Sequence, residues 1–140
     1  MPDYFLAKTE PSSFSIDDLQ HEGVTTWDGV HSHQAVGFIK QWKIGDKVFI
    51  YHSTGHACIV GLAEVVSEPE KDMQDERNIS WFARLRFVYK YPEDRVIKLK
   101  QIKETHLFDD FYLVRQGRLS VMPCPDKFVN WLHDQGLEIE

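Results

Sequence analysis

Cysteine is scarce in this chain, which has two, Cys58 and Cys124, and no CxxC pair. A disulfide-stapled scaffold needs more cysteines, so the sequence predicts two free thiols in a reducing cytoplasm, with one disulfide between them as the alternative. Long apolar runs are also missing, and the first residues lack the basic-then-apolar pattern of a signal peptide. We therefore expect a cytoplasmic protein that does not enter the membrane.

Positive charge is also in short supply. The 16 Lys and Arg residues are outnumbered by 22 Asp and Glu residues, which gives a formal net charge of −6. Proteins that coat long duplexes neutralise many phosphates and are usually basic, so this balance argues against nonspecific coating of nucleic acid. It leaves room for a local basic rim around a specific pocket. Part of the acidity falls in residues 68–77, which we interpret as a solvated loop.

Apolar residues, by contrast, are plentiful. Of the 140 residues, 42% are hydrophobic and 13% aromatic, which is enough for one core and leaves little room for a second. We therefore expect a single domain over residues 1–140, and we expect it to be monomeric.

Hydrophobic periodicity predicts strands interleaved with short helices. Strands are expected over residues 4–8, 48–52, 58–66, 81–90 and 118–121, with residues 96–99 pairing back onto 81–90. Helices are expected over residues 15–23, 32–43 and 125–136, with one turn over 100–105. Residues 25–30 are expected to form a loop. The fold class is therefore α+β, with five or six strands in one twisted sheet that curls toward a barrel and short helices packed on it.

Polar and aromatic residues gather at the predicted strand ends and loops, where folds place their binding sites. Five segments of this kind, or near them, resemble the EVE domain family, which is related to the PUA and YTH domains. They occur in family order: Lys-Thr-Glu-Pro-Ser-Ser at 8–13, Thr-Trp-Asp-Gly-Val at 26–30, Gly-Asp-Lys-Val-Phe-Ile-Tyr-His-Ser at 45–53, Gly-Leu-Ala-Glu-Val-Val at 61–66 and Arg-Gln-Gly-Arg-Leu-Ser-Val at 115–121. The main departure is Gly55-His56-Ala57, where the family has variable, often proline-bearing sequence.

The resemblance implies a PUA-like fold, with a curled, mostly antiparallel, barrel-like sheet, flanking helices and a pocket at one end. It also implies a binding module without a cofactor. YTH domains hold a methylated base in an aromatic cage, and the ligand implied for an EVE domain is a modified cytosine, such as 5-methylcytosine, in DNA or RNA. The expected partner is therefore nucleic acid that contains modified bases.

The residues suit this task, because a flipped base needs flat apolar walls and polar groups at its pairing edge. Trp27 is the expected stacking residue, and Tyr51 or His52 the expected opposing wall. We expect hydrogen-bond acceptors among the carboxylates and hydroxyls, and donors and a basic rim among the lysine, glutamine and arginine side chains. The expected ligand-binding set is Lys8, Thr9, Glu10, Trp27, Asp28, Gln34, Tyr51, His52, Ser53, Arg115, Arg118 and Ser120.

Several of these residues have an ordinary structural alternative. Trp27 could fill the core, as large aromatic side chains usually do. Tyr51 and His52 are neighbours on a predicted strand and point to opposite faces, so at least one of them could be a core residue. Arg115 and Arg118 could simply pair with nearby carboxylates at the surface.

Metal binding and catalysis are the remaining alternatives. His52 and His56 have a spacing that shares one face only on a helix, and this segment is predicted as strand and loop, so we expect no metal site. Glu10 with Asp28, or Ser53 with His52, could suggest acid–base or nucleophilic chemistry, but no recognised catalytic motif accompanies them. We therefore expect a non-catalytic binding module. The alternatives are an enzyme that acts on modified nucleic acid and a binder of a small anionic metabolite in the same pocket.

Overall fold

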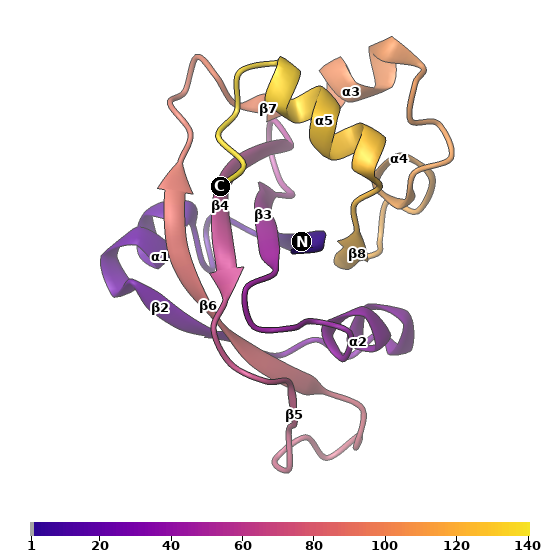
Figure 1. The fold of residues 1–140 in the computed structure, drawn as a ribbon. Coiled ribbons are helices and arrows are strands. Elements are labelled where there is room, and N and C mark those ends of the chain that lie inside the picture. The colour runs from indigo at the N-terminus through magenta and orange to yellow at the C-terminus, as the bar shows by residue number, and fades with distance from the viewer. Residues whose placement is uncertain (1) are drawn as a thin grey trace.

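The computed structural model describes residues 2–140, which form one sheet of eight strands and five short helices (Figure 1). The strands are β1 (Tyr4–Thr9), β2 (Val24–Trp27), β3 (Lys47–His52), β4 (Cys58–Val65), β5 (Glu70–Lys71), β6 (Trp81–Lys90), β7 (Ile97–Lys98) and β8 (Val121–Pro123). The helices are α1 (Ile16–Glu22), α2 (His33–Ile39), α3 (Leu99–Thr105), α4 (Tyr112–Arg115) and α5 (Asp126–Asp134). The α+β class is confirmed.

The sheet runs in the order β2-β6-β4-β3-β1-β8, with β5 paired to β6 and β7 paired to β4. β1 and β3 are parallel, and the other paired strands in residues 2–140 are antiparallel, which confirms a mostly antiparallel sheet. The expected count of five or six strands was too low, because β2, with four residues, and β5, with two, leave little periodic signal. Within residues 2–140 no ladder joins the edge strands β2 and β8, so the sheet is curled rather than closed.

The prediction of a loop over residues 25–30 was wrong in its first half. Residues 24–27 form β2, whose last residue, Trp27, pairs with Ala83 of β6. β-Branched and aromatic side chains such as these favour a pleated strand over a loop. The turn begins only at Asp28, and Gly29 then takes a positive φ of 74°.

Two further boundaries differ from the sequence prediction. α2 ends at Ile39 rather than residue 43, because Gln41 and Trp42 donate to carbonyls three residues back and the chain tightens out of the α-helix. Trp42 is nevertheless buried, as its helical spacing predicted. The last strand is Val121–Pro123 instead of residues 118–121, because Leu119 closes a turn onto the Gln116 carbonyl first.

Three pairing details were also missed. β7 pairs with β4 through Ile97 and Ile59, not with β6. The acidic stretch contains β5, which extends the outer part of β6 as a short, exposed ribbon (Figure 1). The alternation along β6 breaks at Phe87 and Val88, which are both half-buried, because a β-bulge shifts the register with β4.

The core lies between the sheet and its helices, and its C-terminal part is aromatic. Phe128 of α5 is fully buried, and its ring lies 4.6 Å from that of Phe111 and 5.1 Å from that of Phe108, centroid to centroid. The predicted buried face of this helix is confirmed. Cys58 and Cys124 are both free. No helix in residues 2–140 has the length and apolar character needed to cross a membrane.

Candidate binding site

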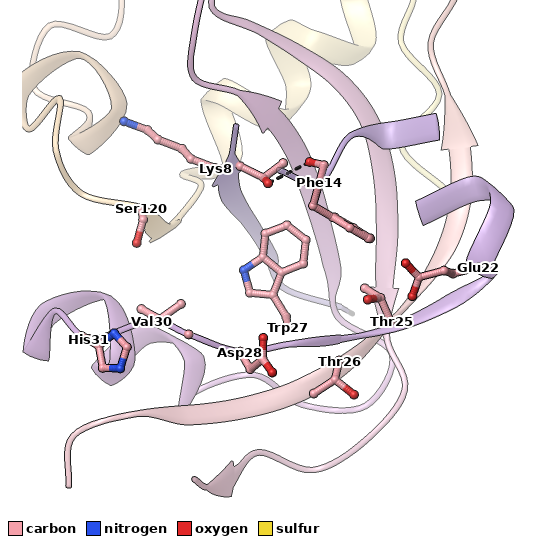
Figure 2. Close-up of a pocket in the computed structure, with 12 residues that line it drawn as sticks. Lys8, Phe14, Glu22, Thr25, Thr26, Trp27, Asp28, Val30, His31 and Ser120 are labelled. Atoms are coloured by element: carbon pink, nitrogen blue, oxygen red, sulfur yellow. Dashed lines mark hydrogen bonds between the residues drawn. The ribbon is translucent and has the colours of Figure 1, made fainter. Parts of the chain in front are cut away.

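One pocket of about 490 Å³ lies where the two edges of the curled sheet approach each other (Figure 2). β2 lines one side, while the end of β1 and the residue before β8 line the other. The backbone N–H of Lys8 donates to the Ser120 carbonyl at 2.8 Å, which holds the second side together. The lining residues are Lys8, Thr9, Phe14, Glu22, Thr25, Thr26, Trp27, Asp28, Gly29, Val30, His31 and Ser120.

Trp27 is the large aromatic wall of this pocket. Strand pairing with Ala83 fixes its backbone, and its ring meets Phe14 edge to face, with the centroids 6.2 Å apart. Trp27 is 8% exposed, so it is a core residue whose indole also lines the pocket. Figure 2 shows the indole between Phe14 and Asp28, with its ring nitrogen on the side of Ser120. The wall is therefore rigid and carries an N–H donor at its edge.

Lys8 forms the basic corner of the pocket. Its Nζ donates to the Gly117 carbonyl at 2.9 Å and lies 5.5 Å from the centroid of the Tyr51 ring. Because the ammonium is partly removed from water, burial lowers the pKa of Lys8. An anionic group placed beside Lys8 would stabilise the charged form, so this corner favours an anion.

Phe14 reaches the pocket because a tight turn follows β1. The N–H groups of Ser13 and Phe14 donate to the Glu10 carbonyl at 3.0 and 2.9 Å, and the Thr9 hydroxyl donates to the Phe14 carbonyl at 2.8 Å. Ser15 then caps α1 with a capping box. The Glu10 backbone thus builds the turn, and its exposed side chain is not part of the pocket lining.

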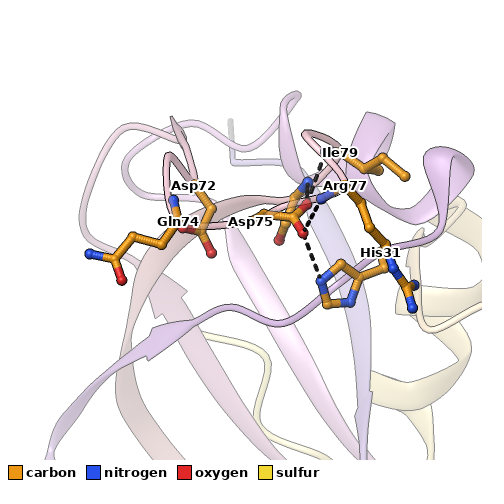
Figure 3. A network of polar contacts seen from close by, with 7 residues as sticks. His31, Asp72, Gln74, Asp75, Arg77 and Ile79 are labelled. Carbon is orange, nitrogen blue, oxygen red and sulfur yellow. Dashed lines mark hydrogen bonds and ion pairs between the residues drawn. The ribbon is translucent and has the colours of Figure 1, made fainter.

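Residues 28–31 line the pocket as a loop, and this loop contacts the loop between β5 and β6 on its outer side (Figure 3). His31 Nε2 lies 3.4 Å from a carboxylate oxygen of Asp75. The backbone N–H groups of Ser80 and Ile79 donate to the other carboxylate oxygen of Asp75 at 2.7 and 2.9 Å. These hydrogen bonds are the main reason that the pKa of Asp75 is lowered to about 2. Among residues 2–140, no three His, Cys, Asp or Glu side chains are placed to hold a metal ion.

Three residues that the sequence predicted for the site, Tyr51, His52 and Ser53, do not line the pocket. Tyr51 is 2% exposed, and burial raises its pKa to about 12. His52 is half-buried and its Nε2 accepts from the Ile16 N–H at 3.1 Å, which fixes the start of α1. Ser53 donates through its N–H to the Thr9 carbonyl at 3.0 Å. The structure therefore gives these three residues structural contacts and leaves the pocket with Trp27 as its one large aromatic wall.

The remaining predicted residues lie beside the pocket. Gln34 and Arg118 share a separate depression of about 340 Å³, and Arg115 is exposed on α4. Within residues 2–140, neither arginine is in an ion pair, so the surface pairing that we weighed for them is not observed. Both guanidinium groups remain free to meet an anion.

Comparison with known proteins decides the family. Residues 3–135 match the EVE domain. The chain belongs to the EVE domain family. This confirms the resemblance, which rested on five segments spread from residue 8 to residue 121.

Relatives of this EVE domain include thymocyte nuclear protein 1. The rat protein is 40% identical over 91 residues, which cover 56% of this chain and 40% of that protein. The chicken protein is 28% identical over 152 residues, which cover 86% of this chain and 63% of that protein. The chain thus spans less than two thirds of the length of these curated relatives.

Solved structures share the fold over nearly the whole chain. A Pseudomonas syringae protein superposes with a TM-score of 0.86 at 31% identity, covering 96% of this chain and 99% of that one. The human THYN1 protein in complex with DNA that contains 5-methylcytosine gives a TM-score of 0.84 at 26% identity, covering 98% and 99%. An ASCH protein from Zymomonas mobilis, at 13% identity and a TM-score of 0.62, shares the fold alone.

Sequence reasoning missed several lining residues of the EVE domain. Thr25 lies on the same strand face as Trp27, and strand periodicity would have found it had β2 been recognised. Phe14 directly precedes the cap of α1, and its contact with Trp27 carries no local signal. The other missed residues are Glu22, Thr26, Gly29, Val30 and His31.

The stability of the EVE domain is expected to fall below about pH 6.5, in part through His52. Burial lowers the pKa of His52, against a smaller opposing effect of the Asp17 carboxylate, and a protonated Nε2 cannot accept from Ile16. The folded pKa is lowered, so this contribution is present above the unfolded pKa and is lost as pH falls through the folded one. Urea unfolding should show that this contribution lowers the free energy of unfolding by about 1 kcal/mol, the net contribution of one hydrogen bond.

The matched variant is His52→Gln, which keeps an acceptor that does not titrate. The other six histidines are common to both proteins. The difference in their unfolding free energies between about pH 7.5 and pH 5 therefore isolates His52. An identical pH dependence in the two proteins would contradict the role given to this imidazole.

Proposed function

We propose that this EVE domain binds one modified base, a modified cytosine in nucleic acid, in the Trp27 pocket and performs no covalent chemistry on it. The observation that carries the proposal is a pocket with one rigid indole wall, an acceptor at Asp28, donors at its rim and a basic corner at Lys8. Its volume of about 490 Å³ falls among those of small-molecule sites. The complex of the related human THYN1 protein with DNA containing 5-methylcytosine supports the choice of ligand.

Each pocket group has a part in holding such a base. The Trp27 indole stacks on the ring of the base, a contact worth about 1–3 kcal/mol. The Asp28 carboxylate offers hydrogen-bond acceptors, so it suits the amino group of cytosine and disfavours the carbonyl that thymine carries at the same position. The Ser120 hydroxyl is a donor for the ring nitrogen or the carbonyl of cytosine. Val30 offers apolar contact to a methyl group.

Binding without reaction agrees with the polar contacts around the pocket. His31 is the imidazole at its edge, and its Nε2 contacts Asp75 rather than a hydroxyl of the pocket. A serine or threonine nucleophile needs an adjacent base within hydrogen-bond reach. Lys8 is likewise engaged with the Gly117 carbonyl, which makes it a fixed charge at the rim.

The test is a titration of short oligonucleotides that differ at one base, at one stated salt concentration, in DNA and in RNA. We expect 5-methylcytosine to bind about fourfold more tightly than cytosine, since one buried methyl contributes about 0.8 kcal/mol. Thymine should bind more weakly than both, because it keeps the methyl group and loses the amino group. Equal affinity for all three bases would overturn the proposal.

A further inference from the structure

A second hollow, of about 710 Å³, lies between the loop after β3 and the start of α3. We call it the lysine hollow, because Lys98, Lys100 and Lys103 line it and all three are exposed. The lining contains one carboxylate, that of Glu104. Among residues 2–140, none of the three lysines is in an ion pair. On a chain with a net charge of −6, this is a concentration of unneutralised positive charge.

The lysine hollow is fixed to the same end of the sheet as the base pocket. β1 and β3 are parallel and end in register, with Thr9 opposite His52, and the Ser53 N–H donates to the Thr9 carbonyl. Thr9 lines the base pocket, and Gly55, two residues after Ser53, lines the hollow. Two residues span at most about 7 Å. The two sites are therefore neighbours, separated by one short stretch of loop.

The floor of the lysine hollow is held by the sheet. The Leu99 N–H donates to the Ala57 carbonyl at 2.9 Å, and Lys98 pairs in register with Cys58 of β4. In Figure 1, β7 and α3 lie together near the end of β3 and the start of β4. The lysines thus keep a defined position relative to the base pocket.

The other side of the base pocket carries the opposite charge. Asp28 and His31 of the pocket also line a depression of about 450 Å³ on the outer loop, whose other charged residues are Asp72, Asp75, Glu76 and Arg77. Figure 3 shows His31, Asp72, Asp75 and Arg77 at this loop. A phosphate backbone is repelled by this acidic surface and attracted by the lysines. Charge therefore directs a bound strand away from this acidic loop and toward basic groups such as the three lysines.

We propose that the strand whose base enters the Trp27 pocket continues across residues 53–57 and that Lys98, Lys100 and Lys103 bind its phosphates. This rests on the proposed function for the identity of the base, and it adds the path of the strand and the residues that hold it. Lysine is a point charge for phosphate, so these contacts hold the strand without selecting a base.

The test compares Lys100→Gln/Lys103→Gln with wild type in titrations of a single-stranded oligonucleotide with one 5-methylcytosine at several salt concentrations. Each lost phosphate contact lowers the slope of log affinity against log salt by about 0.7, so the double variant should lose about 1.4. Its binding at about 50 mM salt should be about tenfold weaker or more. The ratio of affinities for modified and unmodified oligonucleotides should stay unchanged, because it is set in the pocket.

The matched control is Lys43→Gln/Lys71→Gln, which removes the same charge from two exposed lysines that lie outside both sites. The control should keep the wild-type slope. A wild-type slope in Lys100→Gln/Lys103→Gln would overturn the strand path while a preference for 5-methylcytosine stands. Conversely, a reduced slope with no preference for the modified base in any protein would overturn the proposed function and keep the strand path.

Discussion

Replacing Trp27 with alanine is expected to weaken binding of the modified base by tenfold or more. A stacking contact of about 1–3 kcal/mol corresponds to a change in affinity of about 5- to 150-fold, and the tenfold loss, at 1.4 kcal/mol, lies within this range. The same change removes a core side chain that is 8% exposed and packed on Phe14, and Trp→Ala in a core costs about 3–5 kcal/mol of unfolding free energy. Affinity is to be measured under conditions in which urea unfolding shows the variant to be folded.

The Trp27→Phe variant separates the loss of stacking on the base from the loss of packing in the core. Phenylalanine keeps an aromatic face for the base and much of the packing against Phe14, so stability should fall less than in the alanine variant. Binding should weaken less as well, and by the same factor for unmodified and modified cytosine, because both stack through the same ring. A folded Trp27→Ala variant with wild-type affinity would show that the base does not stack on this residue.

Phe128→Ala is expected to lower the unfolding free energy by about 3–5 kcal/mol. Phe128 is fully buried, and its ring is packed against those of Phe108, Phe111 and Trp131. Removing it leaves a cavity among three rigid rings that cannot collapse easily. The midpoint of urea unfolding should shift with little change in its slope, because the surface exposed on unfolding is nearly the same.

The control for Phe128→Ala is Asn130→Ala, an exposed position on the same helix, which should stay within about 0.5 kcal/mol of wild type. Since α5 contributes no residue to the Trp27 pocket, the folded fraction of Phe128→Ala should bind the modified oligonucleotide normally. A loss of less than about 1 kcal/mol would mean that the aromatic cluster relaxes around the missing ring.

Much of the fold could be predicted because buried helices and strands have periodic patterns of apolar residues in the sequence. The central strands β3 and β4 are apolar on both faces, and their predicted bounds are within one residue of those observed. β2 was missed because it is an edge strand of four residues, and its pairing with β6, nearly sixty residues later, leaves no local pattern. The sheet curl is a property of the assembled strands, so which edges meet could not be foreseen.

The candidate site was likewise predicted in part. Lys8, Thr9, Trp27, Asp28 and Ser120 were predicted from strand ends and family motifs, and they line one pocket. The sequence did establish that the neighbours at positions 51 and 52 point to opposite faces. It could not say that both faces are occupied, one by the core and the other by the start of α1.

Because the pocket lies between the two edges of the sheet, it is completed late during synthesis of the chain. The pocket needs the Trp27 strand from the first fifth of the chain and, on the opposite side, Ser120 from its last fifth, which the Lys8–Ser120 hydrogen bond holds against β1. Contacts this distant in sequence close late, since the loop entropy between them must be overcome first. A nascent chain that has not yet released residue 120 from the ribosome has its stacking wall but only half of its site. It can therefore engage no base until translation of the domain is nearly finished.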